Sequence, residues 1–253
     1  MTSATKEQRI AQLEGYAKTL VQALRVMDER RHILQPLLRD AEIAAALANK
    51  FRNTFGAHAY NHLVPMMAQD LVRDLARLFM DDDRRAASFV NVYRKAAEPS
   101  LHRELRRRFR EIPDKWHDQP GPIPGLPEEQ SDQVREQWRD RDRQEFEASF
   151  DEGWTLVTAA VKALETDVVG QKIKTFRDKF HAHLEMAPLG ADPGPFDVSS
   201  LGLTFNDLLD FADRYMEPAF ELMQVITGSV HNVQDSRRFI VGTVLTCGVS
   251  WPA

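Results

Sequence analysis

Apolar residues recur every three or four positions through most of this chain, and they leave no run from which a sheet could be built. The first such seam consists of Ile10, Leu13, Ala17, Leu20, Leu24 and Met27. Steps of three and four bring side chains onto one face of an α-helix, whereas a half-buried strand alternates at every second position. The chain is therefore predicted to be all-α, an antiparallel helical bundle of about five to seven helices around one core.

Prolines, acidic runs and capping residues divide this periodic sequence into separate helices. Pro36 is expected to interrupt the first helix, because proline clashes with the preceding turn. Beyond it, helices are expected over residues 40–47, from 66 to an acidic stop at 81–83, and over 88–97, 101–112 and 131–165.

The last predicted helix starts at a capping box. Thr204 and Asp207 have the spacing of that motif, with aspartate in the usual glutamate position. Pro218 should kink the helix. Its inward face is predicted to hold Leu208, Ala212, Tyr215, Ala219, Met223 and Ile226.

Long loops and a tail interrupt the bundle. Residues 113–127 contain five prolines and two glycines in fifteen positions, a composition typical of a loop. A loop of that length is too long for an ordinary connection between helices. We interpret residues 113–130 as an inserted loop, either a lid or a disordered segment. A second loop is expected around residues 188–195, and residues 239–247 are β-like, an edge strand or a segment laid over the bundle. The predicted domains are a single helical domain over residues 1–230 and a C-terminal tail over 231–253.

Composition excludes several classes of protein. The net charge of −5 gives no overall attraction to nucleic acid, so any such binding has to be local. The single cysteine, Cys247, excludes an internal disulfide and cysteine-based zinc sites. The N-terminal residues lack the apolar run of a signal peptide, and no stretch has the ~18 apolar residues of a membrane span. We expect a soluble, cytoplasmic protein that uses no cofactor and no membrane.

One stretch, residues 175–184, has a constellation from which chemistry can be argued. Read as an α-helix, it places Arg177 and His181 one turn apart on one flank of an apolar stripe. His183 falls on the other flank, ~120° from Arg177. Asp178 follows Arg177 directly, and it can either hold that guanidinium or orient His181.

The spacing of Arg177 and His183, with an acidic residue after the arginine, resembles the HEPN superfamily (higher eukaryotes and prokaryotes nucleotide-binding). Its signature is an arginine, four to six residues and then a histidine. The stretch 51–89 is also similar to the abortive-infection U-type (AbiU-like) branch: an Arg-Asn…His segment, a long apolar helix and an acidic stop. The resemblance covers about residues 41–185, is interrupted by the proline-rich insertion, and does not include residues after 230.

The resemblance implies a helical bundle that forms a homodimer and cleaves single-stranded RNA without metal, as a toxin or effector in prokaryotic defence. In that role Arg177 would clamp the phosphate, His183 would transfer the proton, Asp178 would orient and His181 would be a secondary candidate. The chemistry suits these residues. Histidine accepts protons near neutral pH, and guanidinium stabilises developing phosphate charge with a bidentate fork. Arg177 and His183 diverge on one helix, but two copies of the helix that face each other can direct both groups at one phosphate.

Two other interpretations of the same residues stay open. The protein can be a non-catalytic HEPN binding module that acts through a partner, such as an antitoxin or a nucleotidyltransferase. It can also be a structural bundle, in which Arg177 only pairs with a carboxylate at the bundle edge and His183 is a hydrogen-bonded core histidine.

His58 and His62 have the i, i+4 spacing of metal-binding helix pairs, but no glutamate or cysteine ligand accompanies them. We therefore predict no metal site. Tyr60 and Leu63 are expected to pack inward, and the histidines to face a groove or solvent. Asn61 and His62 are candidates for RNA contact.

The predicted helix over residues 101–112 is locally basic. Its arginines Arg103, Arg106, Arg107 and Arg110 are candidates for steering an RNA backbone toward the cleft. A solvated face is the alternative. In that case carboxylates of a neighbouring helix, namely Glu136, Asp140, Asp142 and Glu145, are expected to neutralise the run.

Overall fold

The computed structural model describes residues 5–118, 123, 125–182 and 198–229, with the backbone alone at 128–129, 180–182 and 198. No strand occurs in these residues, so the all-α prediction is confirmed. The α-helices are α1 Lys6–Arg39, α2 Ala41–Phe51, α3 Phe55–Leu75, α4 Phe89–Ala96, α5 Pro99–Arg110, α6 Asp114–His117, α7 Glu128–Glu165, α8 Val168–Phe176 and α9 Phe205–Thr227. Two π-helical turns, η1 Ala76–Met80 and η2 Arg177–Ala182, extend α3 and α8, and a 3₁₀ turn, η3 Val198–Leu201, lies before α9.

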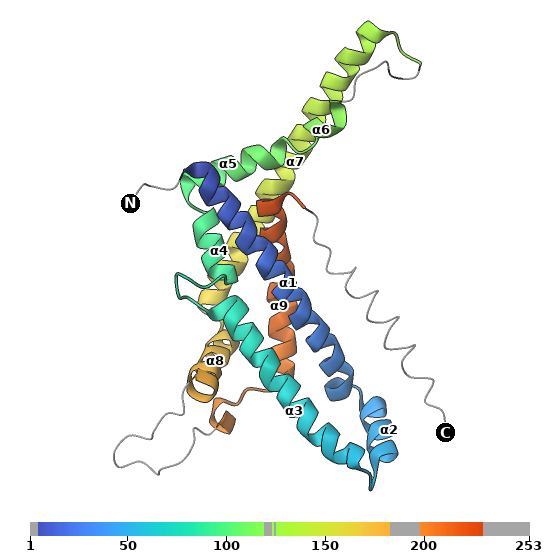
Figure 1. The fold of residues 1–253 in the computed structure, drawn as a ribbon, viewed down its shortest axis with the longest axis vertical. Helices are drawn as coiled ribbons and strands as arrows, with labels where there is room; N and C mark the ends of the chain where they lie inside the picture. Colours follow the sequence, from blue (N-terminus) through green and yellow to red (C-terminus); the bar gives the residue numbers. More distant parts are fainter. Residues whose placement is uncertain (1–4, 119–122, 124, 183–197, 230–253) are drawn as a thin grey trace.

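Helix α9 is the centre of the elongated bundle and packs against both α1 and α7 (Figure 1). Every residue of the predicted seam in α1 is buried, and so is every residue of the predicted inward face of α9. Phe79 of η1 joins this core by edge-on contact with Phe211, the two ring centroids lying 5.9 Å apart. The described core residues form one continuous cluster.

The prolines break fewer helices than expected. Pro36 lies inside α1, which ends only at Arg39, so the predicted interruption is wrong. Proline lacks only its own N–H donor, so one i→i−4 bond is lost. The helix continues past it and closes with the Asp40 amide donating to the Pro36 carbonyl at 3.2 Å. Helix α3 likewise runs through Pro65, and α9 through Pro218.

Side-chain caps begin several of the helices. Ser88 caps α4 and Asp167 caps α8, each accepting hydrogen bonds from backbone amides. The capping box at the start of α9 is present, with both the Thr204 and the Asp207 side chains bonded across it. The capping box depends only on neighbours in the chain, which is why the sequence alone predicts it.

The proline-rich insertion is shorter than predicted. Helix α6 lies inside residues 113–130, and α7 already begins at Glu128. Its described residues lie at the end of α7 far from α8 (Figure 1), so they form no lid over Arg177. The second predicted loop at 188–195 and the β-like segment at 239–247 lie outside the described residues. None of the described helices is long and apolar enough to cross a membrane.

A charged cluster is built into α1. Asp28 and Arg31 are 1% and 2% exposed, and the Arg31 guanidinium donates to the Asp28 carboxylate at 2.9 Å and also pairs with Asp213 of α9. The His32 ring lies against the same group, its Nδ1 being 3.2 Å from Asp28 Oδ1. Its hydrogen bond to Asp28 raises the pKa of His32, although burial opposes this.

Candidate active site

The helix that leads to Arg177 is fixed at its first residue by Asp167. This buried carboxylate accepts hydrogen bonds from the Gly170 amide at 3.0 Å and from the Tyr215 hydroxyl at 2.8 Å. Arg214 adds an ion pair at 2.6 Å. Burial opposes ionisation, but these donors keep the pKa of Asp167 below its usual value. One carboxylate therefore caps α8 and ties it to α9.

Close packing then sets α8 against η1. A Cβ atom at Gly170 would meet the Met80 sulfur at 3.0 Å and Phe211 Cε2 at 3.2 Å, so only glycine allows this approach without displacement of a neighbour. Ile173 and Phe176 are buried on the same side, as the apolar stripe predicts. The end of α8 is thus held at a defined place beside η1.

The α-helical register of the predicted motif ends at Phe176. From Arg177 to Ala182 the backbone is a π-helix, η2, with the wider i→i+5 turn. The angle expected between Arg177 and His181 on an ideal α-helix therefore does not describe this segment, and His183 lies outside the described residues. Isolated π-helical turns occur preferentially at functional sites, and the other described π turn, η1, packs directly against α8.

Arg177 lies between two carboxylates. Its Nε donates to Asp178 Oδ1 at 2.7 Å, so the residue that follows the arginine also contacts it. A second carboxylate, that of Asp81, lies 3.8 Å from the guanidinium and belongs to the residue that directly follows η1. The Arg177 side chain is 21% exposed, so the guanidinium is oriented by protein while one side stays open to solvent.

The turn that carries Asp81 is itself held rigidly. The Asp81 carbonyl accepts hydrogen bonds from Ser88 Oγ at 2.6 Å and from Asn91 Nδ2 at 3.2 Å. The same Asn91 amide donates to the Asp83 carbonyl at 2.6 Å. Ser88 and Asn91 are both buried, so α4 fixes the backbone on which the acidic side chains stand.

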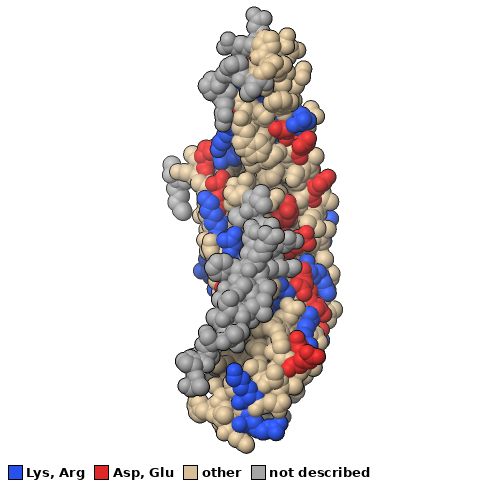
Figure 2. Space-filling view, turned by 90° about the vertical axis from the view of Figure 1, so that its right-hand side faces the viewer, with Lys and Arg blue, Asp and Glu red and all other residues tan. Residues whose placement is uncertain are grey.

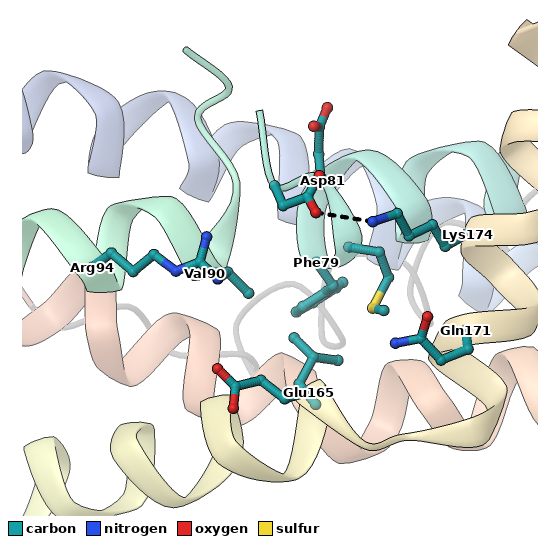
Figure 3. A pocket seen from close by; sticks show the side chains of 10 residues that line it. Phe79, Asp81, Val90, Arg94, Glu165, Gln171 and Lys174 are labelled. Carbon is teal, nitrogen blue, oxygen red and sulfur yellow. Dashed lines mark hydrogen bonds and ion pairs between the residues drawn. The ribbon is translucent and has the colours of Figure 1, made fainter. Parts of the chain in front are cut away.

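A second ion pair joins the acidic turn to α8, one helical turn before Arg177. The Lys174 ammonium donates to Asp82 at 3.0 Å, and this bond lowers the pKa of Asp82. Behind the pair lies a cavity of about 170 Å³ between α4, α7, α8 and η1, here called the turn pocket. Figure 3 shows Arg94 on one side of it, Gln171 and Lys174 on the other, and Glu165 of α7 between them.

The histidines of the motif are less fully described. Residue 181 belongs to η2, but only its backbone is described, and His183 lies outside the described residues. Of the four predicted catalytic residues, Arg177 and Asp178 are therefore in contact with each other. The positions of the His181 and His183 side chains stay predictions.

The predicted RNA-binding arginines lie away from this site and are largely neutralised. Arg106 pairs with Asp151 at 2.7 Å and with Glu147, and Arg107 bonds Glu111 at 2.6 Å and the buried Glu104. Arg110 lies 3.6 Å from Glu147, and Arg103 donates to the carbonyl of Pro99. Helix α5, which carries these arginines, lies toward one end of the bundle and α8 toward the other (Figure 1).

The neutralising carboxylates are not those expected. Glu136, Asp140 and Asp142 pair with arginines of α7 itself, namely Arg139, Arg143 and Arg141, and Glu145 lies near Arg141. These pairs join residues one, three and four positions apart along α7 itself. Figure 2 accordingly shows acidic and basic side chains interleaved along the visible face rather than one basic surface.

The remaining candidates lie on the exposed side of α3. Asn61, His58 and His62 are exposed, as predicted for the two histidines. Leu63 is 55% exposed, so the prediction that it packs inward is wrong; the buried stripe of α3 passes through Val64 instead. The described residues contain no group of three or more histidine, cysteine, aspartate or glutamate side chains that could hold a metal ion.

Sequence reasoning missed Asp81, Asp82 and Lys174 as parts of the site. Residues 81–83 were interpreted only as the end of a helix. Three consecutive aspartates are more than the end of a helix requires. The extra acidic residues were the sequence signal that this turn has cationic partners. Their partners on α8 are too distant in sequence for any spacing rule to connect them.

These features define the class of protein: an all-α, HEPN-like bundle with an arginine–aspartate pair at the end of a helix. A sequence model of HEPN_AbiU2, described as AbiU2, matches residues 10–241. That match spans most of the chain, so the protein belongs to the AbiU2 family of HEPN domains, which is related to abortive infection. No curated protein and no solved structure matches the chain.

Proposed function

We propose that this protein is a metal-independent endoribonuclease that acts as a toxin or effector in abortive infection or in a toxin–antitoxin pair. The observation that carries the proposal is the placement of Arg177, held by Asp178 and Asp81 at the start of a π-helical turn and still partly open to solvent. Preorganised cations are the groups that stabilise charge developing on a phosphate. Three and five residues after Asp178 the sequence has two candidate acid–base groups, His181 within η2 and His183 just past it.

The proposed reaction needs only side chains of this chain. The ribose 2′-hydroxyl loses its proton to one histidine, and its oxygen forms a bond to the adjacent phosphorus. The bond from phosphorus to the 5′-oxygen of the next nucleotide breaks, that oxygen takes a proton from a second, protonated histidine, and a 2′,3′-cyclic phosphate remains. Arg177 neutralises the phosphorane charge in between, with a bidentate geometry that lysine does not provide. Asp178 and Asp81 limit the rotation of Arg177, which reduces the entropy lost when phosphate binds.

We further propose that the active form is a homodimer of one helical domain over residues 1–230, with residues 231–253 as a tail. A two-fold interface puts the same surface patch on both subunits. Such an arrangement brings Arg177 of one copy near the histidines of the other, so that the phosphate is held by groups from two chains. Arg103, Arg106, Arg107, Arg110, Asn61 and His62 stay proposed RNA contacts away from the reacting phosphate.

The test is incubation of the purified protein with end-labelled single-stranded RNA in EDTA. Wild type is expected to cleave, and Arg177→Ala to lose about 100-fold or more of the rate. Arg84→Ala is the matched control, because Arg84 is an exposed arginine next to the acidic turn. Cleavage that needs added metal, or equal rates for wild type and Arg177→Ala, would contradict the proposal.

One observation favours a second candidate, a non-catalytic module that acts through a protein partner. An apolar cavity of about 500 Å³ lies between α3, the end of α8 and the start of α9, beside Phe176 and Phe205. Phe205, which lines the cavity, is 43% exposed, and Leu63 and Met66 of α3, the helix that forms one wall, are 55% and 60% exposed. Exposed apolar side chains around a groove are typical of a protein-binding surface.

The two candidates differ in what Met66→Asp and Leu63→Asp would do. Under the nuclease proposal these variants keep cleaving RNA, because both residues lie outside the Arg177 site. Under the partner proposal they lose the biological effect of the protein together with binding of an antitoxin or nucleotidyltransferase, while Arg177→Ala retains both.

A further inference from the structure

The turn pocket combines an apolar floor with polar side chains from three helices. Phe79, Met80, Val90 and Leu164 form the floor, and each is at most 8% exposed. The polar rim comes from Arg94 of α4, Glu165 at the end of α7 and Gln171 of α8. At about 170 Å³ the cavity is below the 300–1,000 Å³ that is usual for a drug-sized ligand, so it suits one flat ring system.

These rim groups are not used inside the described part of the protein. Glu165 and Gln171 make no side-chain hydrogen bond to another described residue, and Arg94 makes only a 3.5 Å contact with Asn91 Oδ1. The two aspartates that line the pocket are, in contrast, already paired: Asp82 with Lys174 and Asp81 with Arg177. A carboxylate, an amide and a guanidinium are therefore available to a ligand at one apolar cavity.

That set of groups matches guanine better than the other bases. Guanine offers two acceptors, O6 and N7, to a guanidinium, and two neighbouring N–H donors, N1–H and N2–H, to a carboxylate. Adenine would present the acceptor N1 to Glu165, and uracil has one N–H donor between two carbonyl groups. Cytosine can donate its amino group to Glu165 but has a single N–H₂ donor there and no N7 for Arg94.

The pocket is also placed correctly for a nucleotide at the Arg177 site. Lys174 of α8 lines the pocket and lies three residues before Arg177, the first residue of η2, which continues α8. A base in the pocket would thus leave its phosphate near these two cations. We propose that the turn pocket binds the guanine base of the nucleotide whose phosphate lies at Arg177, with Glu165 as acceptor and Arg94 as donor. This deepens, and rests on, the proposed RNA cleavage, because it names the base that the site selects.

Binding of free mononucleotides tests the pocket without any cleavage. Isothermal titration with GMP, AMP, CMP and UMP is expected to give at least about tenfold tighter binding of GMP. Glu165→Gln and Arg94→Ala should each weaken GMP binding by about tenfold or more. Glu152→Gln is the matched control, an exposed glutamate of the same helix three to four turns away, and it should bind GMP as wild type does.

A second arm uses RNA oligonucleotides that differ only by G, A, C or U at one position. Tighter binding of the G-containing oligonucleotide than of GMP shows that the pocket takes guanine from RNA, and equal binding shows that it takes the free nucleotide and overturns the RNA assignment. Equal affinity for all four mononucleotides, tighter binding of CMP, or GMP binding unchanged in Glu165→Gln overturns the guanine assignment.

The outcome separates the pocket from the nuclease proposal. If GMP binds selectively and wild type cleaves no RNA, the nuclease proposal fails and guanine recognition by the pocket stands. If wild type cleaves RNA with no preference at any position and GMP does not bind, the pocket proposal fails alone.

Discussion

The carboxylate of Asp81 lies 3.8 Å from the guanidinium of Arg177, and this ion pair joins the ends of two π-helical turns that are far apart in the sequence. Asp178 holds the same guanidinium from the neighbouring position at 2.7 Å. The two carboxylates approach from different elements, so they restrict the arginine more than either could alone. Arg177 is therefore a positioned cation rather than a freely rotating surface side chain.

Removal of the Asp81 charge should reduce cleavage without abolishing it. Asp81→Asn is expected to slow RNA cleavage by about two- to fivefold, the range of a partly exposed ion pair. In an Arg177→Ala background the same change should have no further effect, which a double-mutant cycle measures. Asp83→Asn is the matched control, because Asp83 bonds Arg85 within the turn and is not paired with α8. Additive effects of Asp81→Asn and Arg177→Ala would show that the ion pair has no role.

A catalytic role for histidine should be visible in the cleavage rates of histidine variants and in the pH dependence of the wild-type rate. His183→Ala is expected to lower the cleavage rate by about 100-fold or more, and His181→Ala to cause a smaller loss. The rate of wild type should fall below about pH 6.5, where a histidine base becomes protonated. Circular dichroism checks that both variants keep the helical fold. A flat pH–rate profile would argue against a histidine base.

Asp167 should stabilise the fold more than an ordinary helix cap does. Asp167→Ala removes the cap of α8 and leaves the Tyr215 hydroxyl without its acceptor, which together should lower the free energy of unfolding by about 2–4 kcal/mol. Burial and the neighbouring carboxylate raise the pKa of Tyr215 to about 12, so the hydroxyl stays a donor at neutral pH. Thermal unfolding should show a drop in Tm of about 2–4 °C per kcal/mol.

Comparison variants separate the two contributions of Asp167. Tyr215→Phe should cost about 1 kcal/mol, and Thr204→Ala, which removes the cap of α9, also about 1 kcal/mol. If Asp167→Ala destabilises the protein no more than Thr204→Ala does, the contact with Tyr215 contributes nothing.

The buried cluster of α1 should make stability depend on pH. The pKa of His32 is raised in the folded state, so its contribution is fully present below the unfolded value of 6.5 and is lost as pH rises through the folded pKa. Wild type should therefore lose stability as pH rises above 6.5, and His32→Gln should flatten that loss, as measured by urea unfolding at a series of pH values. A variant with the unchanged pH profile of wild type would exclude His32 as the cause.

The pKa of Asp28 moves in the opposite sense. It is lowered in the folded state despite burial, through the hydrogen bond from His32 and the charge of Arg31. Its contribution is present above the unfolded value of 3.8 and is lost as pH falls through the folded pKa. The acid limb of the stability profile should thus persist in His32→Gln in weakened form.

Assembly can be tested at the motif itself. In a Cys247→Ser background, His183→Cys should form a disulfide-linked dimer under mild oxidation if the two motifs face each other. Gln133→Cys, on an exposed position near the start of α7 and far from α8, is the control and should stay unlinked. A protein that is monomeric at micromolar concentration, or equal crosslinking at both positions, would contradict the shared-site mechanism.

The helical class, most helix ends and the arginine–aspartate motif could be predicted from the sequence because each depends on residues within about one turn of each other. The seam of α1 and the capping box at Thr204 illustrate this, since their geometry is a property of the helix itself. The same rule explains the errors. Helix α1 continues through Pro36 despite the local rule, and Leu63 lies beside a buried stripe whose position is decided by what α3 packs against.

Only the tertiary structure decided which charges act together. Spacing could not show that Asp81 meets Arg177, that Asp82 meets Lys174, or that Arg106 is neutralised by Asp151 of another helix. These contacts follow from the close approach of α8 to η1 at Gly170 and from the packing of α5 on α7. Periodicity determines the face of a helix on which a side chain lies. Contacts between helices depend on how those helices pack against each other. That packing is set jointly by all of their buried residues, so no local pattern in the sequence reveals it.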